Sequence, residues 1–299
     1  MKKIQFSVWP AVKFNGPLPD VLMSVRDKLS LKVLQDAGFE TVIRTDIDES
    51  DPILAMMLPH AAPNVRWFTK ISDYVRLKYI KEYLDAGYDE ILYTDLDMVI
   101  TEAPKSFGVA YEMHLQTTSG DGTGPITKFW SKGVNCTYYI NQSHRPQFEE
   151  HLKNVTADII AAGGNPKFCY PANSMWMMEE GIGHIQNWFH FGSFKEPDFC
   201  TVDNIIQCLT LYTAMYGKIG DVIPQIKAVN AMGTRDLAGL TEEVDKVFAI
   251  NKTIEGLTVS EEMVRAVVAR FEPNVRIRPN YNSQDSRKII WNLIQKYKA

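Results

Sequence analysis

The sequence is poor in cysteine, lacks any long apolar run and is nearly balanced in charge. Its 299 residues hold four cysteines, none of them in a Cys-x-x-Cys pair: Cys136, Cys169, Cys200 and Cys208. This spacing predicts neither a zinc knuckle nor a disulfide scaffold. No run approaches the roughly 18 apolar residues that a membrane helix needs. The 32 basic and 36 acidic residues leave a net charge of −4, which provides no general attraction for nucleic acid.

The N-terminus also lacks the pattern of a secretion signal. The stretch "MKKIQFSVWPAVKF" has two lysines but reaches Trp9 and Pro10 before an apolar core develops. The Asn-x-Ser/Thr triplets are therefore interpreted as chance, and they begin at Asn135, Asn141, Asn154 and Asn251. We expect a cytoplasmic protein with reduced cysteines.

What the sequence does have is an alternation of strand-like and helix-like segments, with 45% hydrophobic residues to form a core. Strands are predicted at about 4–8, 41–44, 90–93, 107–111, 136–140 and 222–229. Helices are predicted at about 20–37, 72–86, 146–162, 203–216 and 284–297, with Ser72 as an N-cap and a capping box from Thr258 to Glu261. The alternation predicts an α/β fold, a mostly parallel sheet flanked by helices.

Two carboxylates follow the predicted strand in "EILYTDLDMVI" (90–100). Ligands of open α/β sheets bind beyond the carboxyl ends of the strands, which is where Asp95 and Asp97 stand. Their i, i+2 spacing brings two hard oxygen ligands to one side of an extended segment. Such a pair suits a divalent metal that keeps open positions for phosphate oxygens. The alternative is an Asp-rich turn that caps neighbouring backbone amides.

The stretch around these acids resembles the core of GT-A glycosyltransferases. In "ISDYVRLKYIKEYLDAGYDEILYTDLDMVI" (71–100), a helix with Ser-Asp-x-x-Arg precedes a glycine turn, a strand and Asp-x-Asp, as in glycogenin-like and related bacterial sugar transferases. The resemblance implies a Rossmann-like GT-A fold, a nucleotide-sugar donor and Mn²⁺ or Mg²⁺. It implies that Asp97 binds the metal, that Asp95 contacts metal or ribose, and that Asp73 and Arg76 lie near the donor. For the last two, the alternative is an exposed i, i+3 pair on a helix.

Three other stretches resemble the same family. "FSVWPAV" (6–12) is similar to a first strand ending near the nucleotide base, on which Trp9 could stack if it is not a core residue. "KGVNCTYYINQSHRPQFEEHL" (132–152) is similar to the strand and helix beneath the acceptor site. "TVDNIIQCL" (201–209) is similar to an Asp-Gln element, which implies that Asp203 lies near the acceptor or the reacting carbon. The alternative for Asp203 is a plain helix N-cap.

The third metal ligand departs from the family pattern. Glycogenin-like enzymes carry His-x-x-Gly-x-x-Lys-Pro-Trp near the end of the domain, and its His completes the metal shell. This chain has "HFGSFKEP" at 190–197, before Asp203, and no His follows position 190. By its similarity to that motif, His190 is predicted as a metal ligand. The alternative is that His190 is a hydrogen-bonded core histidine and that another group completes the metal shell.

"YTDLDMV" also satisfies the signature of haloacid-dehalogenase phosphatases. In that alternative Asp95 is the nucleophile that attacks phosphorus and Asp97 is the acid/base. "GDVIPQIKAVNAMG" (220–233) and Lys195 are similar to later elements of that family, but Gln225 replaces its second Mg²⁺-binding acid. The signature usually lies on the first strand, whereas 94 residues precede it here. The transferase is the preferred interpretation.

We predict a single GT-A-like domain over 1–299, with a helical C-terminal part from about 240. The expected activity is metal-dependent transfer of a hexosyl or pentosyl group from a nucleotide sugar to an acceptor hydroxyl, and the resemblance suggests that the anomeric configuration is retained. The acceptor stays open among a glycan, a lipid-linked sugar, a protein and a modified DNA base. A non-catalytic sugar- or nucleotide-binding module is a third possibility, in which the two acids are structural.

Overall fold

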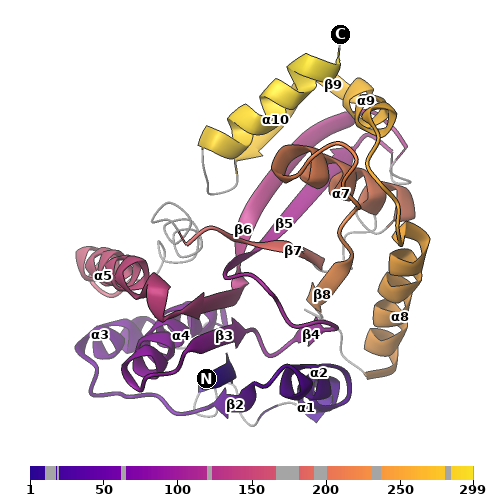
Figure 1. The fold of residues 1–299 in the computed structure, drawn as a ribbon. Coiled ribbons are helices and arrows are strands. Elements are labelled where there is room, and N and C mark those ends of the chain that lie inside the picture. Colours follow the sequence, from indigo (N-terminus) through magenta and orange to yellow (C-terminus); the bar gives the residue numbers. More distant parts are fainter. Residues whose placement is uncertain are drawn as a thin grey trace. The chain divides into compact units, whose positions relative to one another are not determined.

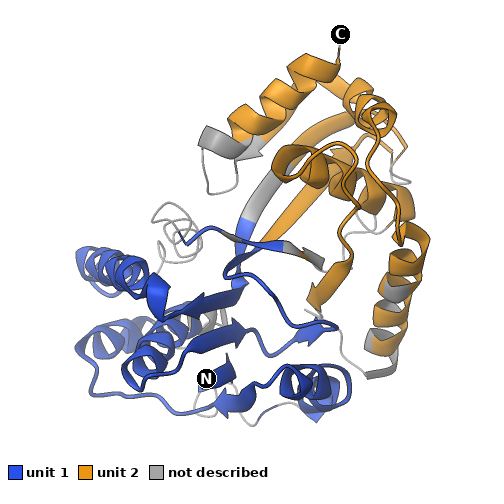
Figure 2. Ribbon diagram, in the orientation of Figure 1, with its two compact units in different colours: residues 1–110, 133–186 blue, residues 111–132, 187–299 orange. Residues whose placement is uncertain are grey.

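The computed structural model describes residues 1–10, 18, 20–61, 65–119, 123–165, 182–191, 201–230, 237–279 and 284–298. Contacts within the chain divide it into two compact units (Figure 2). Unit 1 comprises residues 1–110 and 133–186, and unit 2 comprises residues 111–132 and 187–299. The boundaries between the units fall inside strands. The single domain over 1–299 stays a prediction.

Unit 1 is built on a β-α-β-α-β arrangement (Figure 1). Its strands are β1 (Lys3–Val8), β2 (Glu40–Arg44), β3 (Glu90–Thr94) and the short β4 (Met98–Ile100). The helices between them are α1 (Asp20–Val25), the π-helical turn η2 (Arg26–Ser30), α2 (Leu31–Asp36), α3 (Pro52–Ala61) and α4 (Val65–Asp85). β1 pairs in parallel with both β2 and β3, giving the order β2-β1-β3. The chain leaves β1 for one neighbour and returns past it to the other, so the topological switch point lies between β1 and β3.

The helices α2 and α4 end where the sequence predicts. Gly38 follows α2 with φ 85°, and Gly87 follows α4 with φ 75°, a left-handed conformation that glycine adopts without strain. The predicted start at Ser72 is wrong, because α4 begins at Val65 and Ser72 lies inside the helix. The predicted capping box of Thr258 is also wrong, because Ser260 Oγ accepts from the Met263 amide at 3.1 Å instead.

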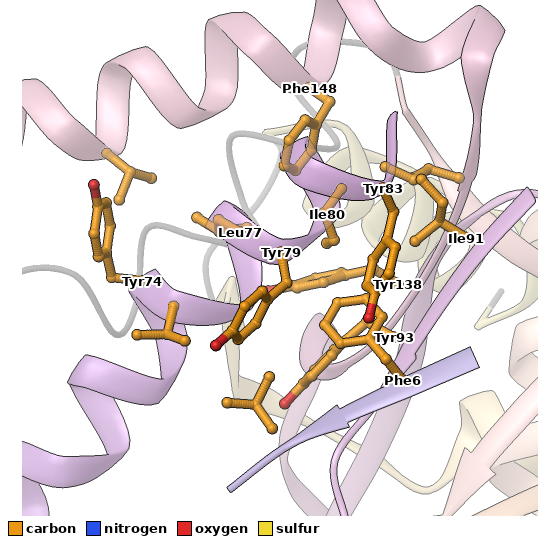
Figure 3. Packing of buried hydrophobic residues seen from close by; sticks show 14 of the residues in the cluster. Phe6, Tyr74, Leu77, Tyr79, Ile80, Tyr83, Ile91, Tyr93, Tyr138 and Phe148 are labelled. Atoms are coloured by element: carbon orange, nitrogen blue, oxygen red, sulfur yellow. The ribbon is translucent and has the colours of Figure 1, made fainter. Parts of the chain in front are cut away.

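Alternation along β1 and β3 separates an apolar face from a polar one. Phe6 packs on the α4 side, with its ring 5.1 Å from that of Tyr83 and 5.3 Å from that of Tyr93 (Figure 3). These rings belong to a buried cluster that also includes Phe148 from α5 (Arg145–Ala161). Full burial of a large apolar side chain stabilises the fold by about 1.5–3 kcal/mol. The intervening residues of the two strands face away from this cluster.

Unit 2 holds the C-terminal elements. They are α7 (Val202–Tyr216), β8 (Ile226–Asn230), α8 (Leu237–Ile254), α9 (Glu261–Ala269), β9 (Phe271–Pro279) and α10 (Gln284–Tyr297). The strands β5 (Gly108–Thr117), β6 (Ile126–Asn141) and β7 (His184–Phe191) belong partly to each unit. The region from about 240 is helical as predicted but also contains β9, which pairs with β6.

The α/β class is confirmed. The pairs β1–β2, β1–β3, β6–β9 and β7–β8 are parallel, and β3–β6 is antiparallel. The sheet is therefore mixed and mostly parallel among the pairs whose registers are described, with helices flanking it. No helix in the described part of the chain is long and apolar enough to cross a membrane.

Candidate functional site

Asp95 and Asp97 lie in the turn that joins β3 to β4, at the carboxyl end of β3. The Asp95 amide donates to the Cys136 carbonyl at 2.8 Å, which attaches the turn to β6. The Met98 amide donates back to the Asp95 carbonyl at 3.2 Å and closes the turn. Leu96 is buried, whereas the two flanking aspartates are partly exposed. The backbone therefore fixes two carboxylates beside the switch point.

The carboxylate of Asp95 is oriented through one of its oxygens. Its Oδ1 accepts hydrogen bonds from the Tyr93 hydroxyl and from Arg76 Nη1, the latter at 3.3 Å. Tyr93 reaches Asp95 because residues two apart in an extended segment lie on the same side. The Asp95 side chain stays 30% exposed. Since both donors hold Oδ1, an incoming ligand would meet Oδ2.

Arg76 lies at the centre of a buried polar network. Its Nη2 donates to Asp73 Oδ1, its Nη1 also donates to the Asn135 carbonyl, and its Nε donates to the Ser72 carbonyl at 3.3 Å. Asn135 Nδ2 donates to the same Asp73 oxygen at 3.1 Å. The side chains of Arg76 and Asp73 are 3% and 0% exposed. The alternative of an exposed helix pair is therefore wrong, and any effect of Asp73 on a ligand would pass through Arg76 and Asp95.

The charges of the site do not cancel. Burial raises the pKa of the Asp73 carboxyl to about 7, since Arg76 offsets the burial only in part and Asp95 adds to it. Burial, and then the charge of Asp95, raise the pKa of Asp97 to about 7. For Arg76, burial would lower the pKa, but the charge of Asp73 outweighs burial and the pKa lies above its usual value. Three carboxylates thus lie near the Arg76 guanidinium, and Lys70 adds a second positive charge that acts on Asp73.

Asp95 and Asp97 fit a divalent cation in charge and in donor type. Carboxylate oxygens are what Mg²⁺ and Mn²⁺ prefer, and the two carboxylates lie in one turn. Within the described ranges, no group of three or more His, Cys, Asp or Glu side chains could hold a metal ion. In the turn after β3, the two residues that could hold such an ion are Asp95 and Asp97.

The other predicted ligand and the phosphatase lysine cannot be placed beside them. His190 lies in β7, where its backbone pairs with Ala228, but its side chain is outside the described residues. Lys195 is outside them as well. Both assignments stay predictions.

The surroundings of Asp203 and of Trp9 are described within their own units. Asp203 is exposed in the first turn of α7. The cap of that helix is Thr201, whose Oγ1 accepts from the Asn204 amide at 3.2 Å, so the N-cap alternative for Asp203 is wrong. Trp9 directly follows β1, is partly exposed, and donates through its backbone amide to the Arg44 carbonyl at 2.8 Å.

A small pocket lies at the switch point beside Asp95. It is lined by Gln5, Ser7, Arg26, Ser30, Leu34, Thr94, Asp95, Leu96, Met98 and Ile100. Its volume of about 10 Å³ corresponds to one water-sized oxygen. The sequence carried a signal for this pocket, because Gln5, Ser7 and Thr94 interrupt otherwise apolar strands. For Asn135 there was no such signal, since only the pairing of β6 with β3 brings it to Arg76.

No protein-family model matches the chain, and no curated protein matches it. Similar solved structures include a glycosyltransferase involved in the glycosylation of the major capsid of PBCV-1, 7% identical with a TM-score of 0.37, covering 84% of this chain and 99% of that one. The galactosyltransferase LgtC in complex with donor and acceptor sugar analogs is 12% identical with a TM-score of 0.40, covering 83% of this chain and 96% of that one. An active-site mutant of LgtC is 12% identical with a TM-score of 0.39, covering 83% of this chain and 96% of that one. At these TM-scores the likeness carries no assignment.

Proposed function

We propose that the protein is a metal-dependent glycosyltransferase with a GT-A-like fold that uses a nucleotide-sugar donor. The observation that carries the proposal is the turn after β3, where Asp95 and Asp97 stand at the switch point of a parallel β2-β1-β3 sheet. Ligands of α/β folds bind at this position. The two carboxylates there suit a cation that in turn holds a diphosphate.

In this proposal Asp95 and Asp97 would hold Mn²⁺ or Mg²⁺, which would supply neutralisation of the diphosphate as it leaves. The surrounding residues orient Asp95: Tyr93 and Arg76 fix its Oδ1, and Asp73 fixes Arg76. Preorganised groups of this kind stabilise developing charge without reorganising during the reaction.

Three further residues have proposed roles. Trp9, at the end of β1, stacks on the nucleotide base. Asp203 orients the acceptor hydroxyl or stabilises positive charge on the sugar ring. His190 completes the metal shell. The acceptor, the choice between a hexosyl and a pentosyl donor, and the cytoplasmic location all stay as predicted from the sequence.

One observation favours the phosphatase as a second candidate. A carboxyl with a pKa of about 7, as at Asp97, suits a general acid/base near neutral pH. The nucleophile of that mechanism would be Asp95, whose Oδ1 already accepts from Tyr93 and Arg76. The turn also follows the third strand of the chain rather than the first. The hydrogen bonds to Asp95 and the position of the turn after the third strand favour the transferase over the phosphatase.

The proposal is tested by thermal unfolding with a panel of nucleotide sugars, each with and without Mn²⁺. A ligand at 100 times its Kd stabilises the folded state by about 2.7 kcal/mol, and we expect at least one donor to do so only when Mn²⁺ is present. Asp97→Asn should abolish this stabilisation because a neutral amide is a poor ligand for a hard cation. Asp36→Asn, a surface change in α2, serves as the matched control. Stabilisation that is unchanged in Asp97→Asn would remove the metal role of this turn.

A further inference from the structure

The pocket between β1, β3 and η2 is lined in part by buried polar groups that are incompletely hydrogen-bonded. Gln5 is 1% exposed, and its Nε2 donates to Ser7 Oγ at 3.1 Å and to Thr94 Oγ1 at 3.0 Å. Its Oε1 has no hydrogen-bond partner. A buried amide oxygen left unpaired costs about 1–3 kcal/mol. The protein retains this cost at the switch point, which is where α/β folds bind ligands.

Of the three hydroxyl groups that line the pocket, those of Ser7 and Thr94 leave one hydrogen unused. Ser7 Oγ and Thr94 Oγ1 lie 3.3 Å apart, and either can donate to the other. Only one of them can do so at a time, and both already accept from Gln5. One hydroxyl hydrogen is therefore available to a third group in the pocket.

Arg26 contributes a second unused donor from η2. Its side chain is 11% exposed, and its Nε has no hydrogen-bond partner. Its ion pair with Asp27 is long, at 3.5 Å, and Asp27 is half exposed, so the pair contributes little. Burial also lowers the pKa of Arg26, although Asp27 opposes this. The π-helical turn that carries Arg26 is a rare form that occurs frequently at functional sites.

The hydroxyl pair and Arg26 thus offer two donors, and Gln5 Oε1 offers an acceptor beside the Asp95 carboxylate that also lines the pocket, around a space for one oxygen. A ligand hydroxyl matches this pattern, because it accepts two hydrogen bonds and donates one. A phosphate oxygen does not match it, since it cannot donate to Gln5 Oε1. A resident water could use the same groups, and the binding test below separates it from a ligand hydroxyl.

We propose that this pocket receives one ribose hydroxyl of the nucleotide donor and that Gln5 and Arg26 determine specificity for ribonucleotides. The inference rests on the proposed function. Asp95, which lines the pocket, also belongs to the turn that would hold the diphosphate. Ser7 lies two residues before Trp9, the proposed base platform. A ribose joins a base to a diphosphate, so its hydroxyls would lie between these two points.

The test is calorimetric binding of UDP, GDP, ADP and CDP with Mn²⁺, followed by the 2′-deoxy and 3′-deoxy forms of the one that binds most tightly. We expect the wild type to bind at least one deoxy form about tenfold or more weakly than the ribonucleotide. This is the change expected when a hydrogen bond to a charged group is lost. In Arg26→Met and Gln5→Met this ratio should fall close to one. Lys28→Met removes an exposed cation of the same turn, and it should retain the wild-type ratio.

Stability separates a specificity role from a structural one. Because Arg26→Met removes a buried donor without a partner, its unfolding temperature should equal or exceed that of the wild type while the ratio collapses. If Gln5→Met fails to fold, the proposal is judged from the ribo-to-deoxy affinity ratio of the wild type and of Arg26→Met. Equal binding of both deoxy forms by the wild type would overturn the subsite and leave the proposed function standing. Retention of the ratio in Arg26→Met would overturn the role of Arg26. Absence of binding by every diphosphate would overturn both proposals.

Discussion

Tyr93 and Tyr138 face each other across the β3–β6 pair, with ring centroids 5.7 Å apart, yet their hydroxyl groups differ. The hydroxyl of Tyr93 donates to Asp95 Oδ1, whereas that of Tyr138 is buried and has no hydrogen-bond partner. Both rings are fully buried in the same cluster (Figure 3). The pair therefore separates the contribution of a ring from that of a hydroxyl that orients the site.

Tyr93→Phe should remove this orientation while preserving the packing. A hydrogen bond to a charged group contributes about 1.5–3 kcal/mol, and we expect a loss of that size in the free energy of unfolding, measured in urea. Loss of a group that orients a metal ligand typically weakens metal binding about 10–100-fold, so Mn²⁺-dependent nucleotide binding should weaken similarly. Tyr138→Phe is the matched control and should be neutral or stabilising. Equal effects of the two substitutions would contradict the role given to Tyr93.

Arg76→Met should be strongly destabilising. It leaves the carboxylates of Asp73 and Asp95 without the cation that both contact, and breaking a buried pair in this way costs about 3–5 kcal/mol. Lys153→Met, at an exposed pair with Glu150, should change the free energy of unfolding by less than about 1 kcal/mol. Urea unfolding of both variants checks the prediction. A small effect of Arg76→Met would mean that the network does not stabilise the turn.

The pKa of Asp73, raised to about 7 by burial, has a definite consequence for stability against pH. The folded protein binds this proton more tightly than the unfolded chain, whose Asp titrates near 3.9. The resulting stabilisation is complete below about pH 4 and is lost as the pH rises through about 7. Asp73→Asn stays neutral throughout. The free energy of unfolding of the wild type minus that of Asp73→Asn should therefore fall between pH 4 and 7.5, measured in urea with EDTA. A difference that is independent of pH would contradict the raised pKa.

The sequence predicts best those elements whose own residues specify them. α10 runs over 284–297 as its amphipathic pattern indicates, and Gly38 and Gly87 end their helices because each adopts a positive φ. The strand β9 was not predicted, because Pro273 and Pro279 interrupt its pattern, and proline disfavours interior strands. β9 exists because β6 pairs with it, which is a tertiary cause that no local pattern contains.

The candidate site likewise contains residues that the sequence indicates and residues whose burial it does not predict. Asp95 and Asp97 stand out in the sequence because two charges between apolar runs need a reason, and the structure places them at the predicted strand end. The burial of Asp73 and Arg76 could not be predicted, because an i, i+3 pair of opposite charge looks the same on a surface helix. Here Asn135, 62 residues away from Asp73, makes the difference.

Asp203 is tested by Asp203→Ser and Asp203→Ala. Because Thr201 already caps α7, removing the carboxylate from its first turn should cost only about 0.3–1 kcal/mol of stability. If Asp203 acts on the acceptor side, both variants should transfer sugar at least about a hundredfold more slowly while donor affinity stays nearly intact, since the interaction is made mainly in the transition state. Rate measurements at saturating donor, together with donor calorimetry, give the two quantities. Wild-type turnover in Asp203→Ser would end the catalytic proposal.

The central claim is that Asp95 and Asp97 hold a metal that activates a nucleotide sugar. It is tested most directly by following a nucleotide sugar in solution by ion-exchange chromatography with Mn²⁺ and no acceptor, beside a generic phosphomonoester. The account predicts slow release of free sugar and nucleoside diphosphate, loss of this release in Asp97→Asn and with EDTA, and no hydrolysis of the phosphomonoester. Rapid phosphomonoester hydrolysis that disappears in Asp95→Asn, with the nucleotide sugar left intact, would contradict the account and establish the phosphatase.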